Sequence, residues 1–446
     1  SGGDSIFGVK VDASGNAYIA GDLRSQDFPI TPGAFSSGNT GTFAGGLVAK
    51  LNPTGTGLVW STRLVLGVNN FSAARKLALD SLGNVIVIGT SQGTTSPVVN
   101  AIQSANAGDW DAFVWKLNSS GTALLFSTYL GGAGRDQGFD VTVDSADNIY
   151  VTGQTNSLNF PTTAGAFSTA NNGGYDIFVT KLTSAGAVQY STYLGGSSDD
   201  CVISWCDVGV DSTGQAYISS DTLSANFPTV NAIDSTYNGA RDAVLSVLRV
   251  DGSGLVFSTF LGGTAQEYRV SLDVLPSGVA FLTGGVSSLN FPVTSGVFQP
   301  IKAGGDDAFV VRISNKPIAN AGPDQSVPEG TLVTLDGTGS TGGSLSYIWT
   351  HVSGPPVALG GATSAHPTFS APPVPPAGGT VTFELVVCEG TSSNCSDPDS
   401  VNVHISNVNQ PPVADAGPDQ TVQEGSPVLL DGTASYDPDV EPLTYQ

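Results

Sequence analysis

The chain has 446 residues, of which 40% are hydrophobic, only 12% are charged and 57 are glycine. This length predicts roughly two to four domains, and low charge with abundant glycine is typical of turn-rich β proteins. The net charge of −23 argues against binding to nucleic acid or to an anionic membrane surface, because both require clustered Lys and Arg. No apolar run reaches the ~18 residues of a membrane helix, so we expect no membrane insertion in this segment.

A sequence motif with four parts recurs along the first 315 residues of the chain. In its clearest copy it reads VDSADNIYVTG (143–153), NFPTTAGAF (159–167), DIFVTKL (176–182) and VQYSTYLGG (188–196). Internal repeats with a period of about 65 residues indicate stacked structural units. The predicted repeats are 1–67, 68–132, 133–196, 197–263 and 264–315.

Each repeat predicts four antiparallel strands. Runs of alternating β-branched and aromatic residues are typical of strands, and the Asp-Ser-x-Gly-Asn segments between them predict hairpin turns. Four-stranded units at a fixed period predict an all-β protein with a five-bladed β-propeller over residues 1–315. The propeller would have more than five blades if further repeats precede Ser1.

The segment at 159–167 joins the second strand to the third. Its proline fixes φ and lacks an amide donor, so we expect the segment to leave the sheet. Phe160 and Phe167 are predicted to fill the seam between neighbouring blades, since buried aromatic rings contribute much of a core's stability. The alternative is a ring of aromatic side chains on which a ligand stacks.

The order of these parts resembles the SBBP-type β-propeller repeat of large exported bacterial and archaeal surface proteins. The resemblance spans residues 1–315, is weaker in the second repeat, and implies no single activity. The fifth repeat stops after DAFVVRI at 307–313, its third strand. We therefore expect residues upstream of Ser1 to supply a closing strand, and the chain to be a processed form or a fragment.

A second repeat follows the propeller. ANAGPDQSVPEG (319–330) returns as ADAGPDQTVQEG (414–425), and Trp349 stands in an alternating strand pattern typical of a sandwich core. These segments resemble PKD domains, close to the REJ-like branch, which serve as spacers and adhesion modules in extracellular proteins. The resemblance implies an Ig-like β-sandwich over 316–408 and the start of a second module over 409–446.

The four cysteines form two close pairs, Cys201 with Cys206 and Cys388 with Cys395. Local pairs of this kind predict two disulfides and an exported protein. The alternative is four unrelated core thiols. Trp205 lies on the loop that the first pair would close, where an exposed ring would be a candidate contact for a partner.

An acidic residue recurs four residues after Gly-Gly, as Asp136, Asp200 and Glu267. We expect these side chains to gather near the propeller axis, where they could bind Ca²⁺ or sugar hydroxyls or act as a glycosidase pair. The alternative is solvated turn residues. A second acid begins each third strand and is expected to accept backbone hydrogen bonds at a turn: Asp111, Asp176, Asp242 and Asp307.

Other motifs for chemistry are sparse. The propeller region contains no histidine and no sequence pattern of a nucleophilic triad or zinc site, so no catalytic or cofactor-binding residue is predicted. Asp437, Asp439 and Glu441 alternate in the last module and form a candidate Ca²⁺ set. The equivalent stretch of the first module has no acids, which argues against a shared metal site.

These features predict a non-enzymatic extracellular or cell-surface protein with a structural or adhesion role. The propeller would be a display or assembly head and the PKD-like modules a stalk, within a surface filament or layer. Its partners would be other surface proteins, copies of itself or glycans, and no cofactor would be required. The second hypothesis is a carbohydrate-binding or glycosidase-like propeller that uses axial carboxylates, and a third is a calcium-stabilised lectin.

Overall fold

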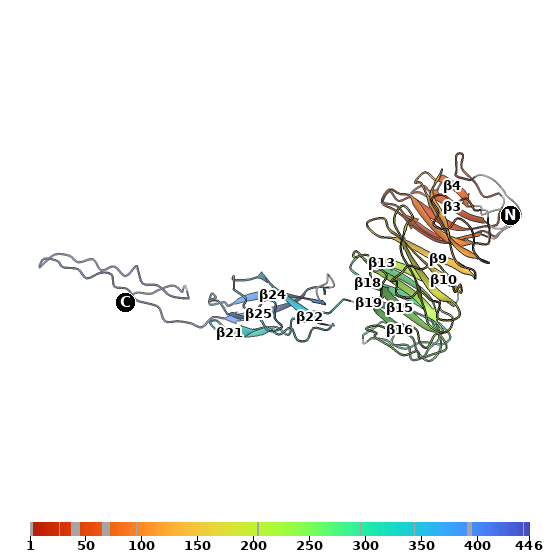
Figure 1. Cartoon of the computed structure of the whole chain (residues 1–446). Coiled ribbons are helices and arrows are strands. Elements are labelled where there is room, and N and C mark those ends of the chain that lie inside the picture. Colours follow the sequence, from red (N-terminus) through yellow and green to blue (C-terminus); the bar gives the residue numbers. More distant parts are fainter. Residues whose placement is uncertain are drawn as a thin grey trace. The chain divides into compact units, whose positions relative to one another are not determined.

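The computed structural model describes residues 3–25, 27–36, 45–64, 72–94, 96–202, 205–294, 296–314, 316–342, 344–389, 395–439 and 441–446. The chain divides into two compact units, Ser1–Ile313 and Ser314–Gln446, and the regular elements of both are β-strands (Figure 1). Within the described ranges there is no helix of the length and apolar character needed to cross a bilayer.

The first unit contains five antiparallel sheets, which follow one another along the chain. Their strands are β1 (Ser5–Val11), β2 (Ala17–Leu23), β3 (Gly45–Leu51) and β4 (Leu58–Leu64); β5 (Ser72–Leu79), β6 (Val85–Ser91), β7 (Asp111–Leu117) and β8 (Leu124–Leu130); β9 (Asp136–Val143), β10 (Ile149–Thr155), β11 (Asp176–Leu182) and β12 (Val188–Leu194); β13 (Asp207–Val210), β14 (Ala216–Thr222), β15 (Asp242–Leu248) and β16 (Leu255–Leu261); and β17 (Glu267–Val274), β18 (Val279–Val286) and β19 (Asp307–Ser314). The first four sheets confirm the predicted all-β unit of four consecutive antiparallel strands. The fifth sheet has three strands.

The hairpin turns form for the predicted reason. In the third sheet, Asp144 Oδ1 accepts the amides of Ala146 and Asn148 at 3.0 and 2.9 Å, which closes the turn between β9 and β10. Asp147 at its tip has φ of +62°, and the other repeats place glycine there, for example Gly83 with φ of +73°. Glycine and short polar residues tolerate this left-handed conformation better than other residues.

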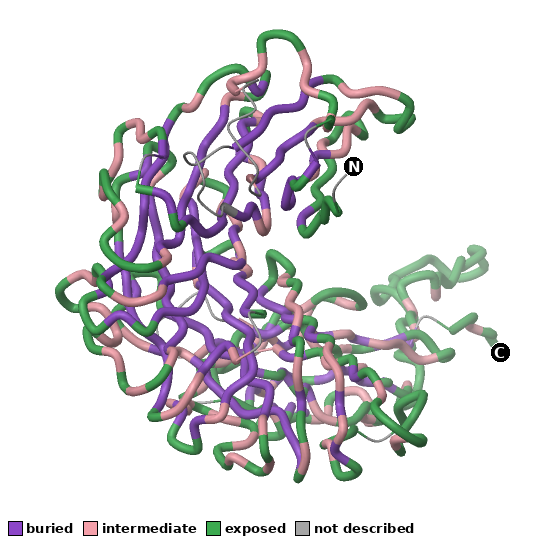
Figure 2. Tube along the Cα trace, turned by 90° about the vertical axis from the view of Figure 1, so that its right-hand side faces the viewer, coloured by how far each residue is buried: buried purple, intermediate pink, exposed green. Residues whose placement is uncertain are grey.

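The buried clusters of the first unit are shared by successive sheets. Figure 2 shows that buried residues follow the strands and exposed residues lie mostly in the peripheral loops. Between the second and third sheets, Ile88 and Val114 pack with Val151 and Phe178. Phe160 joins this cluster, is 3% exposed and stacks on Phe178 with ring centroids 4.7 Å apart. The prediction that this aromatic fills a seam between blades is therefore confirmed.

The companion aromatic of the same segment belongs to the next seam. Phe167 is half-buried against the cluster shared by the third and fourth sheets. Its amide donates to the Gly252 carbonyl at 2.8 Å, in the turn between β15 and β16. The segment at 159–167 therefore links its own sheet to both neighbouring sheets.

The second unit contains two small sheets. Its strands are β20 (Gln325–Pro328), β21 (Leu332–Thr334), β22 (Leu345–Ser353), β23 (Thr368–Ser370), β24 (Gly379–Glu389) and β25 (Asp399–Ser406), in the orders β20-β25-β24-β22 and β21-β23. Trp349 lies in the core between them, as predicted, and its Nε1 donates to the Ser364 carbonyl at 3.1 Å. The described residues of 409–446 are almost all exposed, and one isolated bridge joins Val413 to Tyr436.

Phe160→Ala should lower the free energy of unfolding of the propeller unit by about 3–5 kcal/mol, because truncation of a buried aromatic leaves a cavity at the seam. Urea denaturation followed by tryptophan fluorescence measures this loss. Phe298→Ala is the control, since Phe298 belongs to the equivalent segment of the fifth sheet but is fully exposed. Equal losses for the two variants would contradict the assignment of Phe160 to the core.

Candidate functional site

The recurring acids after Gly-Gly lie inside the protein. Asp136, Asp200 and Glu267 each have 0% exposed surface. Asp136 and Glu267 begin β9 and β17, and Asp200 pairs in an isolated bridge with Thr222 of β14. They are therefore not solvated turn residues, and they do not form an open acidic surface at the axis.

Each of these acids is held by the same kind of donor. Asp136 Oδ2 accepts the Gly132 amide and the Ser157 hydroxyl, both at 2.7 Å. The equivalent glycine amides, from Gly196 and Gly263, donate to Asp200 at 2.7 Å and to Glu267 at 3.0 Å. The carboxylates thus organise the backbone of the Gly-Gly loop.

A second buried acid, from the preceding sheet, stands beside each of them. Asp111, Asp176 and Asp242 begin the third strands β7, β11 and β15, and all have 0% exposed surface. Their Oδ2 atoms accept the amides of residues four positions earlier at 2.8–2.9 Å, and the same bond forms at Asp307. The prediction that this acid accepts a backbone bond at a turn is confirmed at all four positions.

The two acids close around the first glycine of Gly-Gly. A Cβ on Gly131 would lie 2.6 Å from Asp111 Oδ1 and 2.8 Å from Asp136 Oδ2. Gly195 and Gly262 stand in the same relation to their two acids. We call the three sets the seam pairs: Asp111–Asp136, Asp176–Asp200 and Asp242–Glu267. They join the second sheet to the third, the third to the fourth, and the fourth to the fifth.

Burial dominates the electrostatics of the seam pairs. It raises the pKa of Asp111, Asp176 and Asp200 to about 7 and that of Asp242 to about 6. Burial likewise raises the pKa of Asp136 and Glu267. The neighbouring carboxylate adds to the effect at the third-strand acids, because two like charges in a low dielectric disfavour double ionisation. At least one acid of each pair therefore titrates well above the ordinary range.

Calcium does not fit the seam pairs well. Five of the six seam-pair acids have one oxygen without a hydrogen-bond partner among the described residues: Asp111 Oδ1, Asp136 Oδ1, Asp176 Oδ1, Asp242 Oδ1 and Glu267 Oε1. Asp111 Oδ1 lies close to Gly131, only 2.6 Å from where a Cβ on that glycine would be. Ca²⁺ takes six to eight oxygen ligands, whereas each pair offers two carboxylates with oxygens already bonded to amides. No group of three or more His, Cys, Asp or Glu side chains within the described ranges could hold a metal ion.

The predicted calcium set in the last module lies in a turn. Asp437 Oδ1 accepts the amides of Asp439 and Glu441 at 2.8 and 3.4 Å. Asp439 is bonded elsewhere, to Asn407 Nδ2 at 2.9 Å and to the Gln410 amide at 2.5 Å. The Asp437 and Asp439 carboxylates thus bind different partners, and calcium binding here stays a prediction.

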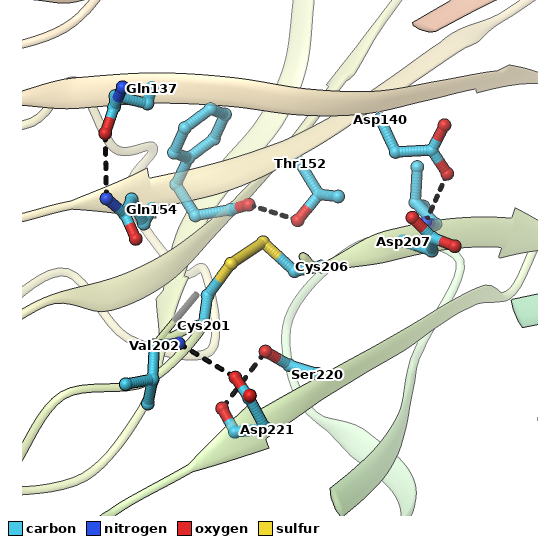
Figure 3. Close-up of a disulfide and its surroundings, with 12 residues drawn as sticks. Gln137, Asp140, Thr152, Gln154, Cys201, Val202, Cys206, Asp207, Ser220 and Asp221 are labelled. Carbon is cyan, nitrogen blue, oxygen red and sulfur yellow. Dashed lines mark hydrogen bonds between the residues drawn. A yellow bond between two sulfur atoms is a disulfide. The ribbon is translucent and has the colours of Figure 1, made fainter. Parts of the chain in front are cut away.

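Both predicted disulfides are present. Cys201 and Cys206 are fully buried, and the Val202 amide donates to Asp221 Oδ1 at 2.8 Å beside them (Figure 3). Trp205 on this loop is 42% exposed, so it remains available as a contact. Residues 203–204 of the loop lie outside the described residues. Cys388–Cys395 closes the hairpin after β24.

Sequence reasoning missed a charged cluster on the axis. A cavity of about 410 Å³ is lined by the first strands of all five sheets. Lys76 lies there, 3.5 Å from Asp207 and 3.9 Å from Asp140. Burial, followed by the charge of Asp207, raises the pKa of Asp140 to about 7. The three residues share one position of the repeat, four residues before the Asp-Ser of the hairpin turn. Sequence reasoning missed this position because its residue type changes from one repeat to the next.

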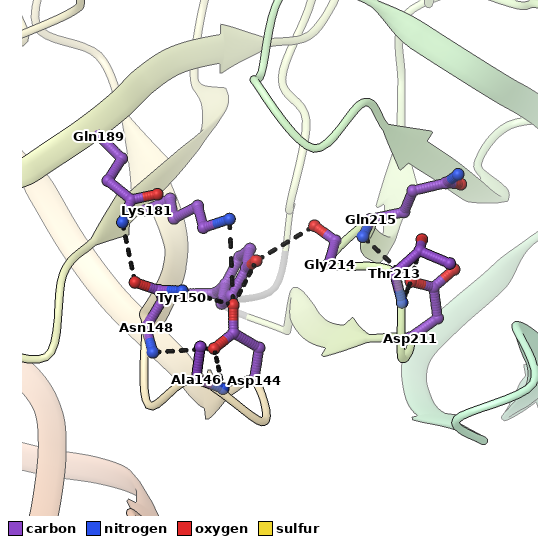
Figure 4. A network of polar contacts seen from close by, with 10 residues as sticks. All are labelled: Asp144, Ala146, Asn148, Tyr150, Lys181, Gln189, Asp211, Thr213, Gly214 and Gln215. Atoms are coloured by element: carbon purple, nitrogen blue, oxygen red, sulfur yellow. Dashed lines mark hydrogen bonds and ion pairs between the residues drawn. The ribbon is translucent and has the colours of Figure 1, made fainter. Parts of the chain in front are cut away.

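A network at the hairpin turns links the third and fourth sheets (Figure 4). Asp144 Oδ2 lies 3.0 Å from the Tyr150 hydroxyl and 3.9 Å from Lys181 Nζ. The Tyr150 hydroxyl is also 3.1 Å from the Gly214 carbonyl, in the next sheet's turn. Burial opposes ionisation of Asp144, but hydrogen bonds led by Asn148 outweigh it and lower the pKa. The network is structural.

The seam pairs predict an unusual pH dependence. The folded pKa values of Asp111, Asp176, Asp200 and Asp242, about 6 to 7, lie above the ordinary 3.8, so between about pH 4 and pH 7 the folded protein binds protons that the unfolded chain has released. The free energy of unfolding should therefore fall as pH rises through this window, by up to about 1.4 kcal/mol per pH unit for each such proton. Urea denaturation at pH 5, 6, 7 and 8 measures the slope.

Asp176→Asn should make this slope shallower, because one titrating group is removed. Asp251→Asn should leave it unchanged, since Asp251 is exposed and hydrogen bonds from Ser253 lower its pKa below this window. A wild-type slope that is flat between pH 5 and pH 8 would contradict the raised pKa values.

Gly195→Ala should destabilise the propeller by about 1–3 kcal/mol, because the added Cβ would overlap Asp176 and Asp200 at once. Thermal unfolding measures the loss. Gly305→Ala is the matched control, since Gly305 is exposed and has no atom within 4 Å of an added Cβ. A tolerated alanine at position 195 would show that the pair does not close on this glycine.

No curated protein matches the chain. Among solved structures, similar chains include a protein of unknown function from Bacteroides caccae (10% identity, 63% of this chain and 71% of that chain, TM-score 0.30) and one from Dyadobacter fermentans (12%, 69% and 79%, 0.33). Another is sucrose-6-phosphate hydrolase from Lactobacillus gasseri (8%, 90% and 86%, 0.30). TM-scores this low carry no argument about function.

Family models match three segments of the chain. Residues 125–161 match the Beta-propeller repeat model, SBBP. Residues 321–405 match one PKD domain model, and residues 409–446 match a second, different PKD domain model. The matched segments agree with the sheets of the first unit and with the sandwich of the second. The chain therefore carries an SBBP-type β-propeller repeat followed by PKD modules.

Proposed function

We propose that this protein is a non-enzymatic structural component of the cell surface or extracellular space. The propeller serves as a rigid head for display or assembly, and the PKD modules serve as a stalk. Its partners are other surface proteins, copies of itself or glycans, within a filament or layer.

The observation that carries the proposal is the position of the recurring acids. The six carboxylates of the seam pairs are fully buried, and each accepts a hydrogen bond from a backbone amide at a junction between sheets. A catalytic or ligand-binding acid must instead reach a substrate in a plausible pose. The repeated polar residues of this chain thus serve to hold the sheets together.

Two further features support the extracellular location. The chain has two disulfides and no free cysteine among the described residues, and disulfides persist mainly in oxidising compartments. PKD modules recur in extracellular proteins, as the sequence resemblance implies. The exposed Trp205 beside the first disulfide offers an anchor of the kind that protein interfaces favour.

One observation favours the second candidate, a carbohydrate-active propeller. Asp140 lines the axial cavity, and Asp207 lies beside Lys76 at its wall. The amides of Val208 and Leu272 donate to Asp140 and Asp207 at 2.9 and 3.2 Å. Glycosidases use two carboxylates of this general type. Lys76 forms ion pairs with both carboxylates, however, and these contacts favour a structural role for Asp140 and Asp207.

Electron cryotomography of the protein in its native surface tests the assembly role. The proposal expects regularly spaced propellers in a lattice or filament. Glycan hydrolysis by the purified chain, with and without Ca²⁺, tests the alternative. Hydrolysis that Asp140→Asn and Asp207→Asn abolish, while Asp251→Asn preserves it, would overturn the non-enzymatic proposal.

A further inference from the structure

The repeats differ from one another at two positions that stand directly before constant, buried acids. One position precedes the third-strand acid and holds Trp110, Tyr175, Arg241 and Asp306. The other precedes the acid after Gly-Gly and holds Arg135, Asp199 and Gln266. A side chain that only supported the repeated framework would be expected to recur with it. The whole chain has only five Trp and 15 basic residues, so their concentration at these positions points to contacts outside the framework.

The two variable positions of neighbouring sheets meet at the surface, directly outside each seam pair. First and third strands run in the same direction in each antiparallel sheet, so both begin on the same face of the unit. At each junction the carbonyl of the first variable residue accepts the amide of the acid that follows the second, at 2.6–2.8 Å. We call these sets the surface pairs: Trp110–Arg135, Tyr175–Asp199 and Arg241–Gln266.

The surface pairs reach solvent and are held in place. Five of the six residues are half-buried, and Gln266 is exposed. The Arg135 guanidinium lies over the Trp110 ring, with its Cζ atom 4.6 Å from the ring centroid. Asp199 Oδ1 accepts the Tyr175 amide at 3.0 Å. Because the seam pairs fix the backbone beneath them, these groups are ordered before any ligand arrives, which lowers the entropy cost of binding.

The charges of the surface pairs cancel, which favours a neutral ligand. Arg241 Nη1 lies 3.6 Å from the buried Asp221 carboxylate, and Arg135 is balanced by Asp199 of the next pair. The chain as a whole carries a net charge of −23, which repels polyanions at long range. A neutral ligand experiences no such repulsion and gains nothing from ionic attraction, so hydrogen bonds and apolar contacts must hold it.

The side-chain types of the surface pairs fit a carbohydrate better than a protein. Aromatic rings such as Tyr175 offer apolar area with a polar edge, and a sugar ring presents C–H groups beside hydroxyls. Guanidinium, carboxylate and carboxamide groups have several donors or acceptors in one plane, which suits neighbouring hydroxyls. The centre of a protein interface is instead depleted of charged residues, whereas Arg135, Asp199 and Arg241 place a charge in every surface pair.

We propose that the surface pairs bind a neutral polysaccharide, and that one polymer chain contacts successive junctions. The Tyr175 ring and the stacked Trp110–Arg135 pair contact the apolar faces of sugar rings, and Asp199 and Gln266 form hydrogen bonds with hydroxyls. This inference rests on the proposed surface role, because it names one class among the partners of that role. It requires no metal and no covalent step.

Affinity electrophoresis of the 446-residue chain in gels that contain dextran, mannan, galactan or xylan tests the proposal, with polygalacturonate as the acidic comparison. We expect saturable retardation by at least one neutral polymer and none by polygalacturonate. Tyr175→Ala and Arg135→Lys should each weaken this binding at least about tenfold. Arg135→Lys keeps the charge and removes the planar fork, so it separates hydrogen bonding from ionic attraction. Tyr445→Ala is the matched control, since Tyr445 is exposed in the second unit.

Thermal unfolding checks that each variant is folded, and Arg135→Lys alone decides if Tyr175→Ala lowers the unfolding midpoint. No retardation by any neutral polymer, retardation by polygalacturonate of equal strength, or unchanged binding of Arg135→Lys would overturn the proposal. A negative result in the gels would leave the tomography test of assembly unaffected. Conversely, irregularly placed propellers that still bind the polymer would count against the assembly role alone.

Discussion

The closure of two buried carboxyl groups around one glycine is the constraint on which three of the four junctions between successive sheets depend. Each seam pair joins the start of a third strand in one sheet to the start of the next sheet, and the Gly-Gly segment passes between them. A side chain on that glycine has no room, and a carboxylate elsewhere would leave the loop amides unpaired. The Gly-Gly mark and its two acids therefore recur together.

This arrangement explains how so acidic a chain packs its sheets. Fully ionised buried pairs would be costly, and the raised pKa values reduce that cost by leaving each pair partly protonated near neutral pH. Elsewhere, as at Asp144, hydrogen bonds and a nearby lysine stabilise the charged form. The repeated polar residues therefore stabilise the junctions between sheets. The exposed loops and, among the described residues, the free strand edge of β19 remain accessible to other molecules.

The parts that sequence reasoning predicted are local. Strand alternation, the Asp144 turn, the seam position of Phe160 and both disulfides depend on residues close in sequence or on a simple repeat. The position of Asp136 could not be predicted correctly, because its partner, Asp111, comes from another repeat and burial depends on how the sheets pack. The Lys76–Asp140–Asp207 cluster comes from one position of three successive repeats, but that position carries a different residue type in other repeats, so no constant motif identified it.

The most direct test of this account is a carbon-13 NMR titration of the aspartate side-chain carboxyl groups, read at Asp111, Asp176 and Asp200. We expect midpoints near pH 7 at these positions, unchanged by millimolar Ca²⁺. Midpoints near the ordinary 3.8, or midpoints that Ca²⁺ lowers, would contradict it. Such midpoints would show that the seam pairs are solvated or bind cations, and that they do not hold the sheets of the propeller together as buried, partly protonated groups.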